Sequence, residues 1–247
     1  MEEQEKIAVE KSTTASKPKK EKKAPSILFK IKKNGRHASP CMTFLRTCIL
    51  PFVRFFYPFK AVGAKKVSDG PCVYVSNHYR MIDPMYVIPT TKEGIHFIAK
   101  KESLDMPIFG WFVKKAKTIF VNRDGNDARA IMDALKCLKH GDKIAIYPEG
   151  KRNTTDQTFL PFKSGCALFA IRSKVPVVPV VIYKKARFLR KNYVIYGEPF
   201  ELSEYYGQKL TEEVLQEAEA KILEKMQTLW TEFDQAMKAK KGKKQCK

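Results

Sequence analysis

Two side chains suited to acid–base catalysis, His78 and Asp83, lie five residues apart. On a regular helix they would point about 140° apart, so they can meet only if the chain turns between them. A turn is expected, because Asp83 is a good N-cap residue and Pro84 a good first helical residue. An N-cap aspartate holds backbone N–H groups with one carboxylate oxygen and leaves the other free. That oxygen could fix the tautomer of His78 and stabilise its protonated form.

The alternative is purely structural: Asp83 only caps a helix and His78 only fills the end of a strand. Spacing alone favours neither interpretation. The other histidines offer less, since His37 lies in a basic segment, His96 in an apolar strand and His140 at a helix end. Only His78 has a carboxylate close in sequence that could orient its ring.

A second cluster occupies residues 147–153, Tyr-Pro-Glu-Gly-Lys-Arg-Asn, where a predicted strand ends. Proline and glycine turn the chain there, and an acid precedes Lys151 and Arg152. Exposed N–H groups beside two cations can bind an anion, although a solvated charged turn would explain the cluster equally simply. A weaker group at residues 121–125 contains Arg123 and also follows a predicted strand.

Several enzyme classes are disfavoured because their motifs are missing. The sequence contains no GxSxG, HExxH, GxxxxGK[ST] or GxGxxG pattern. This argues against a serine hydrolase, a zincin, a P-loop NTPase and a Rossmann dehydrogenase. The six cysteines include no CxxC pair, so neither a disulfide framework nor a zinc site is indicated.

The charge of the chain points to an anionic partner. The formal net charge is +21 over 247 residues, which favours nucleic acid, an anionic membrane face or phosphorylated substrates. The lysines concentrate in residues 1–40, predicted to be disordered, and in a basic tail at 238–247. No zinc-finger, RRM or helix-turn-helix pattern supports the nucleic-acid alternative.

Strands and helices alternate along the rest of the chain, which predicts an α/β fold. The apolar runs predict strands at 72–75, 95–99, 118–121, 143–147, 175–182 and 193–196. One helix is predicted to begin after Asn126 or Asp127 and to end at Gly141. Others are predicted over 164–173 and from Thr211 onward. Prolines within 175–182 predict an edge strand or a bulge.

The most apolar stretch is 41–59, which Pro51 should break or kink into two short helices. It could be a core helix or a membrane-interface anchor. Its many aromatic residues favour the anchor, as does a basic flank formed by Lys30, Lys32, Lys33 and Arg36. No run of 18 apolar residues exists, so no ordinary transmembrane helix is expected.

In order and spacing, these clusters resemble the 1-acylglycerol-3-phosphate O-acyltransferase family, the PlsC-like glycerolipid acyltransferases. Asn77-His78 followed by Asp83 matches the NHX4D block of that family, and 120–123 resembles its second block. Residues 147–152 look like the FPEGTR block, with Tyr147 in place of Phe and Lys151 in place of Thr, and 175–180 look like the proline-bearing fourth block. Residues 100–102 and 108–111 also resemble the segment between the first two blocks. The resemblance covers roughly 41–200.

The resemblance implies a glycerolipid acyltransferase-like mixed sheet flanked by helices, preceded by a short amphipathic helical segment. Together with the composition of the chain, it predicts a disordered basic tail at 1–40, a membrane-interface segment at 41–62, an acyltransferase domain at 63–237 and a basic tail at 238–247. The chain would attach peripherally or monotopically to the cytoplasmic face of a membrane, with anionic lipids as partners.

The implied reaction moves a fatty acyl group from acyl-CoA or acyl carrier protein to the sn-2 hydroxyl of 1-acylglycerol 3-phosphate (lysophosphatidic acid), giving phosphatidic acid. His78 would be the general base and Asp83 its orienting partner. The acceptor-binding residues carried over are Arg123, Glu149, Gly150 and Arg152, helped by Lys151 and Lys100. No metal or cofactor is expected. Glycerol 3-phosphate or another lysolipid as acceptor is the alternative within enzymes, and a basic nucleic-acid-binding protein is the alternative outside them.

Overall fold

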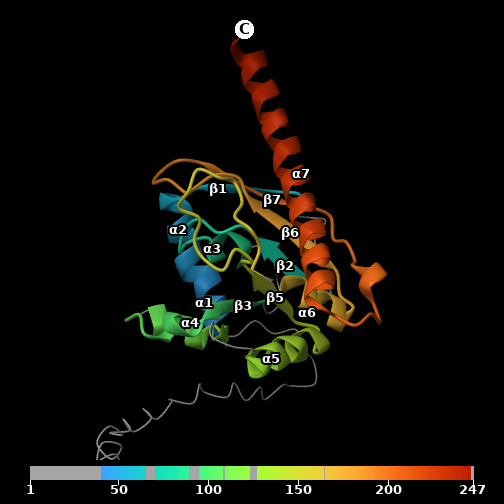
Figure 1. Ribbon diagram of the computed structural model, residues 1–247. Helices are drawn as coiled ribbons and strands as arrows, with labels where there is room; N and C mark the ends of the chain where they lie inside the picture. Colours follow the sequence, from blue (N-terminus) through green and yellow to red (C-terminus); the bar gives the residue numbers. More distant parts are fainter. Residues whose placement is uncertain are drawn as a thin grey trace, which may run out of the picture. The chain divides into compact units, whose positions relative to one another are not determined.

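The computed structural model describes residues 40–64, 70–88, 95–107, 109–122, 127–163 and 165–245. The predicted disordered segment at 1–40 and the cationic flank therefore lie almost entirely outside the described residues, as does Arg123. Within the described part, seven strands form one sheet in the order β1-β7-β6-β2-β5-β3-β4 (Figure 1).

The sheet is mixed. Its strands are β1 (Phe59–Val62), β2 (Val73–Ser76), β3 (Ile95–Lys100), β4 (Ile119–Val121), β5 (Lys143–Ile146), β6 (Val177–Ile182) and β7 (Asn192–Tyr196). Strands β6, β2, β5, β3 and β4 run parallel to one another, whereas β7 is antiparallel to β6 and parallel to β1. This confirms the predicted α/β class with a mixed sheet.

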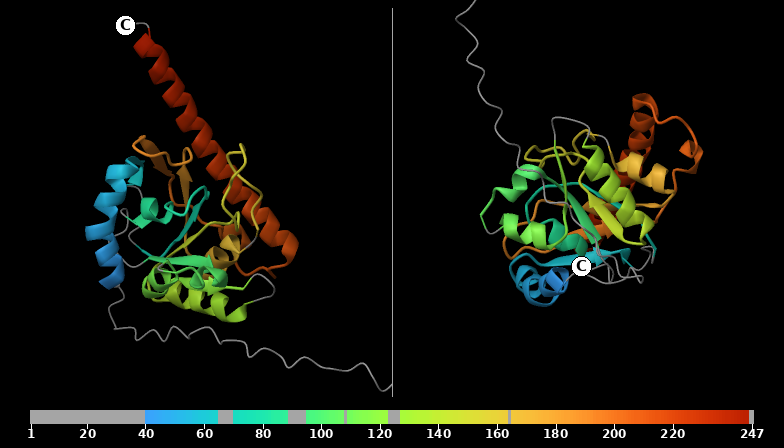
Figure 2. Two further views of the ribbon diagram at one scale, coloured as in Figure 1. Left: turned by 90° about the vertical axis from the view of Figure 1, so that its left-hand side faces the viewer. Right: turned by 90° about the horizontal axis from the view of Figure 1, so that it is seen from below.

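Helices cover both faces of the sheet. They are α1 (Pro40–Phe44), the π-helical turn η1 (Leu45–Ile49), α2 (Leu50–Phe56), α3 (Pro84–Val87), the 3-10 turn η4 (Lys101–Leu104), α4 (Phe109–Lys115), α5 (Ala128–Lys139), α6 (Cys166–Ser173), the 3-10 turn η5 (Ser203–Tyr205) and α7 (Glu212–Gln245). Helix α5 packs on β4 and β5, α6 on β2, and α7 on β6 and β7. The helical run from α1 to α2 lies on the other side of the sheet from α7 (Figure 2).

Strand β2 lies at the centre of the core and is buried along its whole length. Its side chains alternate between the two faces. Tyr74 joins the cluster that contains Met42 and Leu50 of the first helical run. Burial on both faces explains why parallel strands such as β2 read as continuous apolar runs rather than as alternating patterns.

The prolines predicted an edge strand or a bulge at 175–182, and the edge position was wrong, because β6 lies inside the sheet between β2 and β7. Pro179 is tolerated because the β6–β7 ladder begins one residue later, at the pair Val180 and Tyr196. The nitrogen of Pro179, which has no hydrogen to donate, therefore lies just beyond the end of β7, where no ladder bond is needed. The carbonyl of Pro179 still accepts a hydrogen bond from the Gly197 N–H at 2.9 Å. A Cβ at Gly197 would approach the proline ring to 2.7 Å, so glycine makes room for it.

Pro51 does not split the first helical segment into two helices. The segment runs without interruption from Pro40 to Phe56, with η1 immediately before the proline. In this turn the Leu50 N–H donates to Leu45 O, five residues back. A π-type turn widens the helix, which relieves the clash between a proline ring and the preceding turn.

Two domain boundaries differ from the prediction. Residues 59–62, assigned to the membrane-interface segment, form β1 and pair with β7. Residues 238–245, assigned to a tail, continue α7. Lysine is a good helix former and stabilises the C-terminal end of a helix dipole, which explains why a basic run extends α7. By contrast, α5 begins after Asp127 as predicted, and the Asp127 side chain accepts from Ala130 N–H.

Candidate active site

The parallel strands bring three of the sequence clusters to one edge of the sheet. His78 follows β2, Tyr147 follows β5 and Lys100 ends β3, and these three strands are neighbours in the order β2-β5-β3. In open α/β sheets, ligands bind outside the carboxyl ends of the parallel strands. This edge is therefore the candidate active site.

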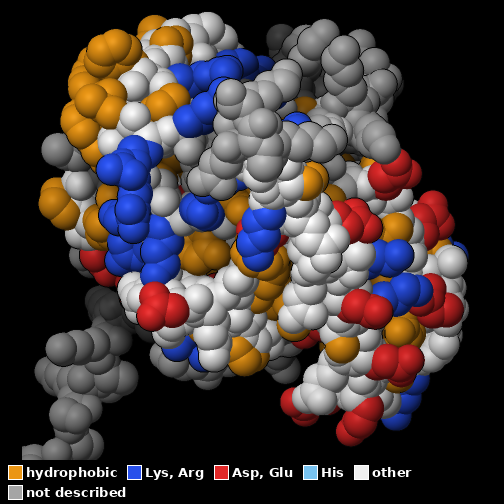
Figure 3. All heavy atoms as spheres, turned by 90° about the horizontal axis from the view of Figure 1, so that it is seen from above, with side chains coloured by type: hydrophobic (Ala, Val, Ile, Leu, Met, Phe, Trp, Pro, Cys, Tyr) orange, Lys and Arg blue, Asp and Glu red, His pale blue; other side chains and the backbone are white. Residues whose placement is uncertain are grey.

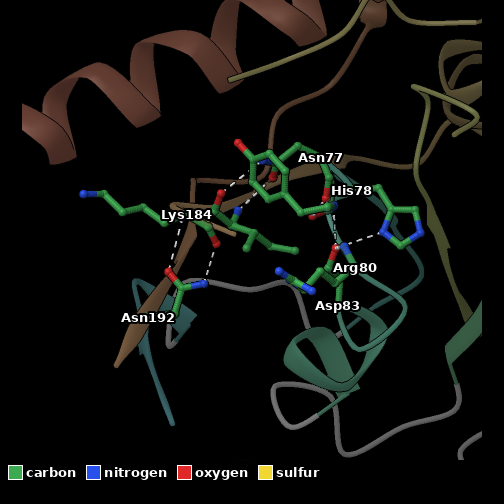
Figure 4. A network of polar contacts seen from close by, with 9 residues as sticks. Asn77, His78, Arg80, Asp83, Lys184 and Asn192 are labelled. Atoms are coloured by element: carbon green, nitrogen blue, oxygen red, sulfur yellow. Dashed lines mark hydrogen bonds and ion pairs between the residues drawn. The ribbon is translucent and has the colours of Figure 1, made fainter. Parts of the chain in front are cut away.

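His78 and Asp83 meet across the turn that follows β2 (Figure 4). His78 Nδ1 lies 2.9 Å from Asp83 Oδ2. The Asp83 side chain is completely buried, whereas His78 retains 19% exposure. A buried carboxylate beside Nδ1 favours the tautomer with its proton on that atom, which leaves Nε2 as the basic nitrogen.

Asp83 does not cap α3, contrary to the prediction. No side-chain capping bond is formed at this helix. Instead the same oxygen, Oδ2, accepts from the backbone N–H groups of Tyr79 at 2.6 Å and Arg80 at 2.7 Å. Oδ1 has no hydrogen-bond partner. The carboxylate therefore folds the turn back on itself and holds the imidazole at the same time, so the purely structural interpretation of Asp83 as a helix cap is wrong.

The ring of Tyr147 stacks on His78. The two ring centroids are 4.3 Å apart and the planes differ by 26°. Burial raises the pKa of the Tyr147 hydroxyl well above its ordinary value, and the charge of Asp83 adds to the shift. The phenol therefore stays neutral, and His78 is held by Asp83 at one nitrogen and by Tyr147 across its face.

The turn after β5 reaches the backbone of His78. Gly150 adopts a positive φ of 62°, and its N–H donates to Tyr147 O at 3.0 Å. Asn153, which is buried, then donates its N–H to His78 O at 2.6 Å. Lys151 and Arg152 are exposed beside this turn. The predicted anion-binding cluster is therefore attached to the loop that carries the histidine.

Glu149 is fully buried, and neither carboxylate oxygen has a hydrogen bond of ordinary geometry. Burial raises the pKa of its carboxyl to about 8, with a further contribution from the charge of Asp83. The backbone N–H groups of His78 and Leu160 oppose this shift without overcoming it. At neutral pH the Glu149 carboxyl is mostly protonated. Its predicted role in acceptor binding stays a prediction.

Asn77 fixes the base of the histidine loop, a role that the sequence did not reveal. Its side chain donates to Ile182 O at 3.0 Å and accepts from Ile182 N–H at 2.8 Å. A little further along, Asn192 bonds both backbone groups of Lys184, at 2.6 and 3.3 Å (Figure 4). Asn77 thereby ties the loop of His78 to the end of β6, and Asn192 ties the start of β7 to the segment that follows β6. Only their position beside predicted strand ends could have drawn attention to them.

Lys100 and Arg123 were also predicted to belong to the site. Lys100 is half-buried at the end of β3, and the position of Arg123 lies outside the described residues. Among the residues that the structure describes, no group of three or more His, Cys, Asp or Glu side chains is placed to hold a metal ion.

Comparison with known proteins places this geometry in a family. The family model described as "Acyltransferase" matches residues 59–183, about half of the chain. The chain is 37% identical over 134 residues to the human 1-acyl-sn-glycerol-3-phosphate acyltransferase beta, covering 52% of this chain and 48% of the human protein. It is 34% identical over 133 residues to the chloroplastic 1-acyl-sn-glycerol-3-phosphate acyltransferase BAT2 of Brassica napus, covering 51% of this chain and 38% of that protein.

The matched region thus spans half or less of the length of these relatives. A solved structure extends the likeness at the level of the fold: the 1-acyl-sn-glycerophosphate (LPA) acyltransferase PlsC from Thermotoga maritima aligns with a TM-score of 0.57 at 23% identity, over 76% of this chain and 80% of that protein. The family match begins with β1, includes the His78–Asp83 turn and the cluster after β5, and ends just beyond β6. The chain belongs to the acyltransferase family.

Proposed function

We propose that this chain transfers a fatty acyl group from acyl-CoA or acyl carrier protein to the sn-2 hydroxyl of 1-acylglycerol 3-phosphate, giving phosphatidic acid. The observation that carries the proposal is the contact of 2.9 Å between a partly exposed His78 and a fully buried Asp83. The names of the relatives support the acceptor, since both are 1-acyl-sn-glycerol-3-phosphate acyltransferases.

In the proposed reaction, His78 Nε2 takes the proton from the acceptor hydroxyl as its oxygen attacks the thioester carbonyl carbon. The new C–O bond forms a tetrahedral intermediate, which collapses as the C–S bond breaks. The leaving thiolate takes the proton from the His78 imidazolium, which returns to its neutral state. The ionised Asp83 stabilises the imidazolium during this cycle, and general acid–base catalysis of this kind contributes about 10²–10⁴-fold.

The acceptor phosphate would be held by cations at the same edge of the sheet. Arg152 and Lys151 are exposed beside the turn that contacts the His78 backbone, and Lys100 ends β3 on the other side of β5. Arg123 follows β4 in sequence, so we assign it to the same site. Binding of the phosphate would fix the hydroxyl beside Nε2, and such positioning can remove several kcal/mol of a barrier, of the order of 7–11 at best.

Glu149 would contribute as a neutral acid. A carboxyl with a pKa of about 8 carries little charge at neutral pH, so it adds no second anion beside Asp83 and leaves the His78–Asp83 pair as the charged unit of the site. Gly150 would let the turn after β5 pass close to the acceptor, because its positive φ suits glycine. The proposed steps need neither a metal nor a cofactor.

The first helical run, Pro40–Phe56, would contact the membrane. In the described residues, no helix is both long and apolar enough to cross a bilayer. Leu45 is buried in the core, whereas Phe44, Phe52 and Phe55 are 51%, 67% and 70% exposed. One side of the run thus packs on the protein while the other offers phenylalanines to the acyl boundary. We propose peripheral or monotopic attachment, on the anionic cytoplasmic leaflet that suits a basic protein.

The test is acceptor-dependent thiol release from a panel of acyl-CoAs, with lysophosphatidic acid, glycerol 3-phosphate and neutral lysolipids as acceptors. We expect the highest kcat/KM with lysophosphatidic acid. A clear preference for glycerol 3-phosphate or a neutral lysolipid would contradict lysophosphatidic acid as the acceptor and identify the preferred compound instead. A salt-sensitive shift of nucleic acid in a gel without any thiol release would contradict the enzymatic proposal.

A further inference from the structure

The loop between β6 and β7, residues 184–191, ends in an exposed apolar tip. Its sequence is Lys-Lys-Ala-Arg-Phe-Leu-Arg-Lys, with five cations and no acid. The backbones of Arg187 and Arg190 form an isolated antiparallel β-bridge across the turn, in which the Arg190 N–H donates to Arg187 O at 3.1 Å. Between these arginines, Phe188 and Leu189 are 58% and 57% exposed. The loop therefore presents two large apolar side chains to solvent inside a ring of positive charge.

The tip is held firmly in this position. The Leu189 N–H donates to Phe56 O at 2.6 Å, at the end of α2. The rings of Phe56 and Phe188 stack with centroids 5.5 Å apart and planes 18° apart. At the base of the loop, Asn192 bonds both backbone groups of Lys184. Because the backbone is tied at the tip and at the base of the loop, Phe188 and Leu189 are held away from the core.

The loop and α2 together form one surface, the aromatic platform, made of Phe52, Phe55, Phe56, Phe188 and Leu189. Phe52 and Phe55 each make edge-to-face contacts with Phe56, which in turn stacks on Phe188. Four of the nine large apolar side chains exposed in the described residues belong to this platform. On this face, hydrophobic side chains gather in a group beside Lys and Arg side chains (Figure 3).

We propose that the loop 184–191 is a second membrane-contacting element, whose tip enters the acyl boundary of an anionic bilayer beside α2. The proposal deepens the membrane attachment proposed above and rests on it. Phe188 and Leu189 would insert while Arg187 and Arg190 bind lipid phosphates, which arginine can do in a bidentate manner. A second copy of the chain fits this platform poorly, because a two-fold contact would bring like-charged loops together.

The position of the loop gives the contact a consequence for the site. It begins at the carboxyl end of β6, the strand parallel to β2, so it leaves the sheet at the edge where His78 follows β2. Asn77, next to His78, bonds both backbone groups of Ile182, the last residue of β6. Lys185 also donates to the backbone carbonyls of Thr154 and Thr155, in the segment after the anion-binding turn. Insertion of the tip would hold this edge against the bilayer that contains the lysolipid.

The direct test places a tryptophan at the tip of the full chain. Brominated lipids in vesicles that contain phosphatidylglycerol should quench the tryptophan fluorescence of Phe188→Trp. The quenched fraction should exceed that of the wild type, whose fluorescence comes from Trp111 and Trp230 alone. Met132→Trp is the matched control, since Met132 is 51% exposed on α5, away from the platform. A tryptophan at 188 that is not quenched while the protein sediments with the vesicles would overturn the proposal, as would a wild-type chain that binds no vesicles.

A second pair of variants separates insertion from charge. Phe188→Ser with Leu189→Asn should weaken partitioning to any vesicle by about tenfold or more; Asn is chosen because Leu189 has a positive φ of 53°, which Asn tolerates. Arg187→Gln with Arg190→Gln should weaken binding to anionic vesicles only. Met132→Ser should change neither. Two results would contradict the membrane contact of the loop. One is wild-type partitioning of the double variant Phe188→Ser with Leu189→Asn; the other is a wild-type dimer in solution that this double variant dissociates.

The outcome is separable from that of the proposed function. In detergent micelles, where no bilayer orients the chain, both loop variants should release thiol from acyl-CoA at the wild-type rate. A wild-type chain without acceptor-dependent thiol release would refute the proposed function, while the quenching at position 188 would still decide the role of the loop.

Discussion

The edge at His78 and the aromatic platform differ in how their side chains are held. At the edge, Asp83 is completely buried and binds three groups with one oxygen, and Tyr147 covers the imidazole. On the platform, Phe52, Phe55, Phe188 and Leu189 are more than half exposed, and the three phenylalanine rings among them all contact the ring of Phe56.

The two regions serve different tasks with different kinds of side chain: buried polar groups at the edge and exposed apolar groups on the platform. Buried polar groups must be paired, so the edge tolerates little change and acts through position and charge. Exposed apolar groups contribute little to the stability of the isolated chain, so the platform can be altered without unfolding the protein. Substitutions at the edge should therefore affect the chemical step, and substitutions on the platform should affect only where the enzyme works.

The largest effect should follow from Asp83→Asn. Asn keeps one oxygen to accept from Tyr79 and Arg80 but removes the negative charge beside the imidazole. We expect kcat to fall by at least about 10²-fold with a folded protein, because the imidazolium loses its stabilising partner. Thiol-release kinetics and circular dichroism test this. A fully active Asp83→Asn enzyme would show that the carboxylate only shapes the turn.

A smaller effect is expected at Tyr147, where Phe and Leu separate the ring from the hydroxyl. Tyr147→Phe keeps the stack on His78 and should stay within about twofold of the wild-type kcat, since the hydroxyl has no partner in the structure. Tyr147→Leu removes the stack, and loss of an aromatic contact of about 0.5–1.5 kcal/mol predicts a fall in kcat of about twofold to thirteenfold.

The split between kcat and KM gives the readout that separates positioning of the base from a general structural role. With Tyr147→Leu, kcat should fall while the KM for each substrate stays near the wild-type value, because only the contact with the imidazole is lost. Equal kcat for the wild type and both variants would remove Tyr147 from the positioning of His78.

Glu149→Gln tests the state of the buried carboxyl through stability. The pKa of Glu149 is raised to about 8, above its value of about 4.3 in an unfolded chain, so the folded protein binds more protons than the unfolded one between these values. The free energy of unfolding should therefore fall as pH rises from about 5 to 8. Gln mimics the neutral acid and should flatten this dependence. Thermal melts at several pH values measure this dependence. If the free energy of unfolding changes with pH in the variant as it does in the wild type, Glu149 is ionised in the folded protein.

The smallest effect on the folded protein should come from Phe52→Ser with Phe55→Ser. The two rings are 67% and 70% exposed, so the melting temperature and the activity on detergent-dispersed substrate should hardly change. Binding to vesicles should fall by about tenfold or more whatever their charge, whereas Met132→Ser should bind as the wild type does. Co-sedimentation measures both, and unchanged binding would locate the anchor elsewhere.

The same comparison explains what the sequence could predict. The turn that joins His78 to Asp83 was predicted because its residues are close together and their types carry the chemistry. Six of the seven strands in the described residues were predicted, because buried strands are continuous apolar runs. The seventh, β1, was assigned to the membrane-interface segment instead. Strand β6 was misplaced because the tolerance for Pro179 depends on Gly197, a residue whose position in the sheet no local pattern gives.

Features made by distant contacts were not predictable. Tyr147 reaches His78 because β5 pairs with β2 in a register that sets Ile146 opposite Val75. The platform exists because Phe188 stacks on Phe56, more than a hundred residues earlier in the chain. In sequence, Phe188 and Leu189 are two apolar residues in a basic loop, which indicates nothing beyond a turn.

The central claim is that His78 is the base for acyl transfer to lysophosphatidic acid, and one paired assay tests it most directly. Wild type and His78→Ala are incubated with acyl-CoA and lysophosphatidic acid in detergent, and phosphatidic acid is quantified by mass spectrometry alongside thiol release. The account predicts equal amounts of thiol and phosphatidic acid from the wild type, and a rate at least about 10²-fold lower from a folded His78→Ala protein. Phosphatidic acid formed by His78→Ala at a near-normal rate would contradict it.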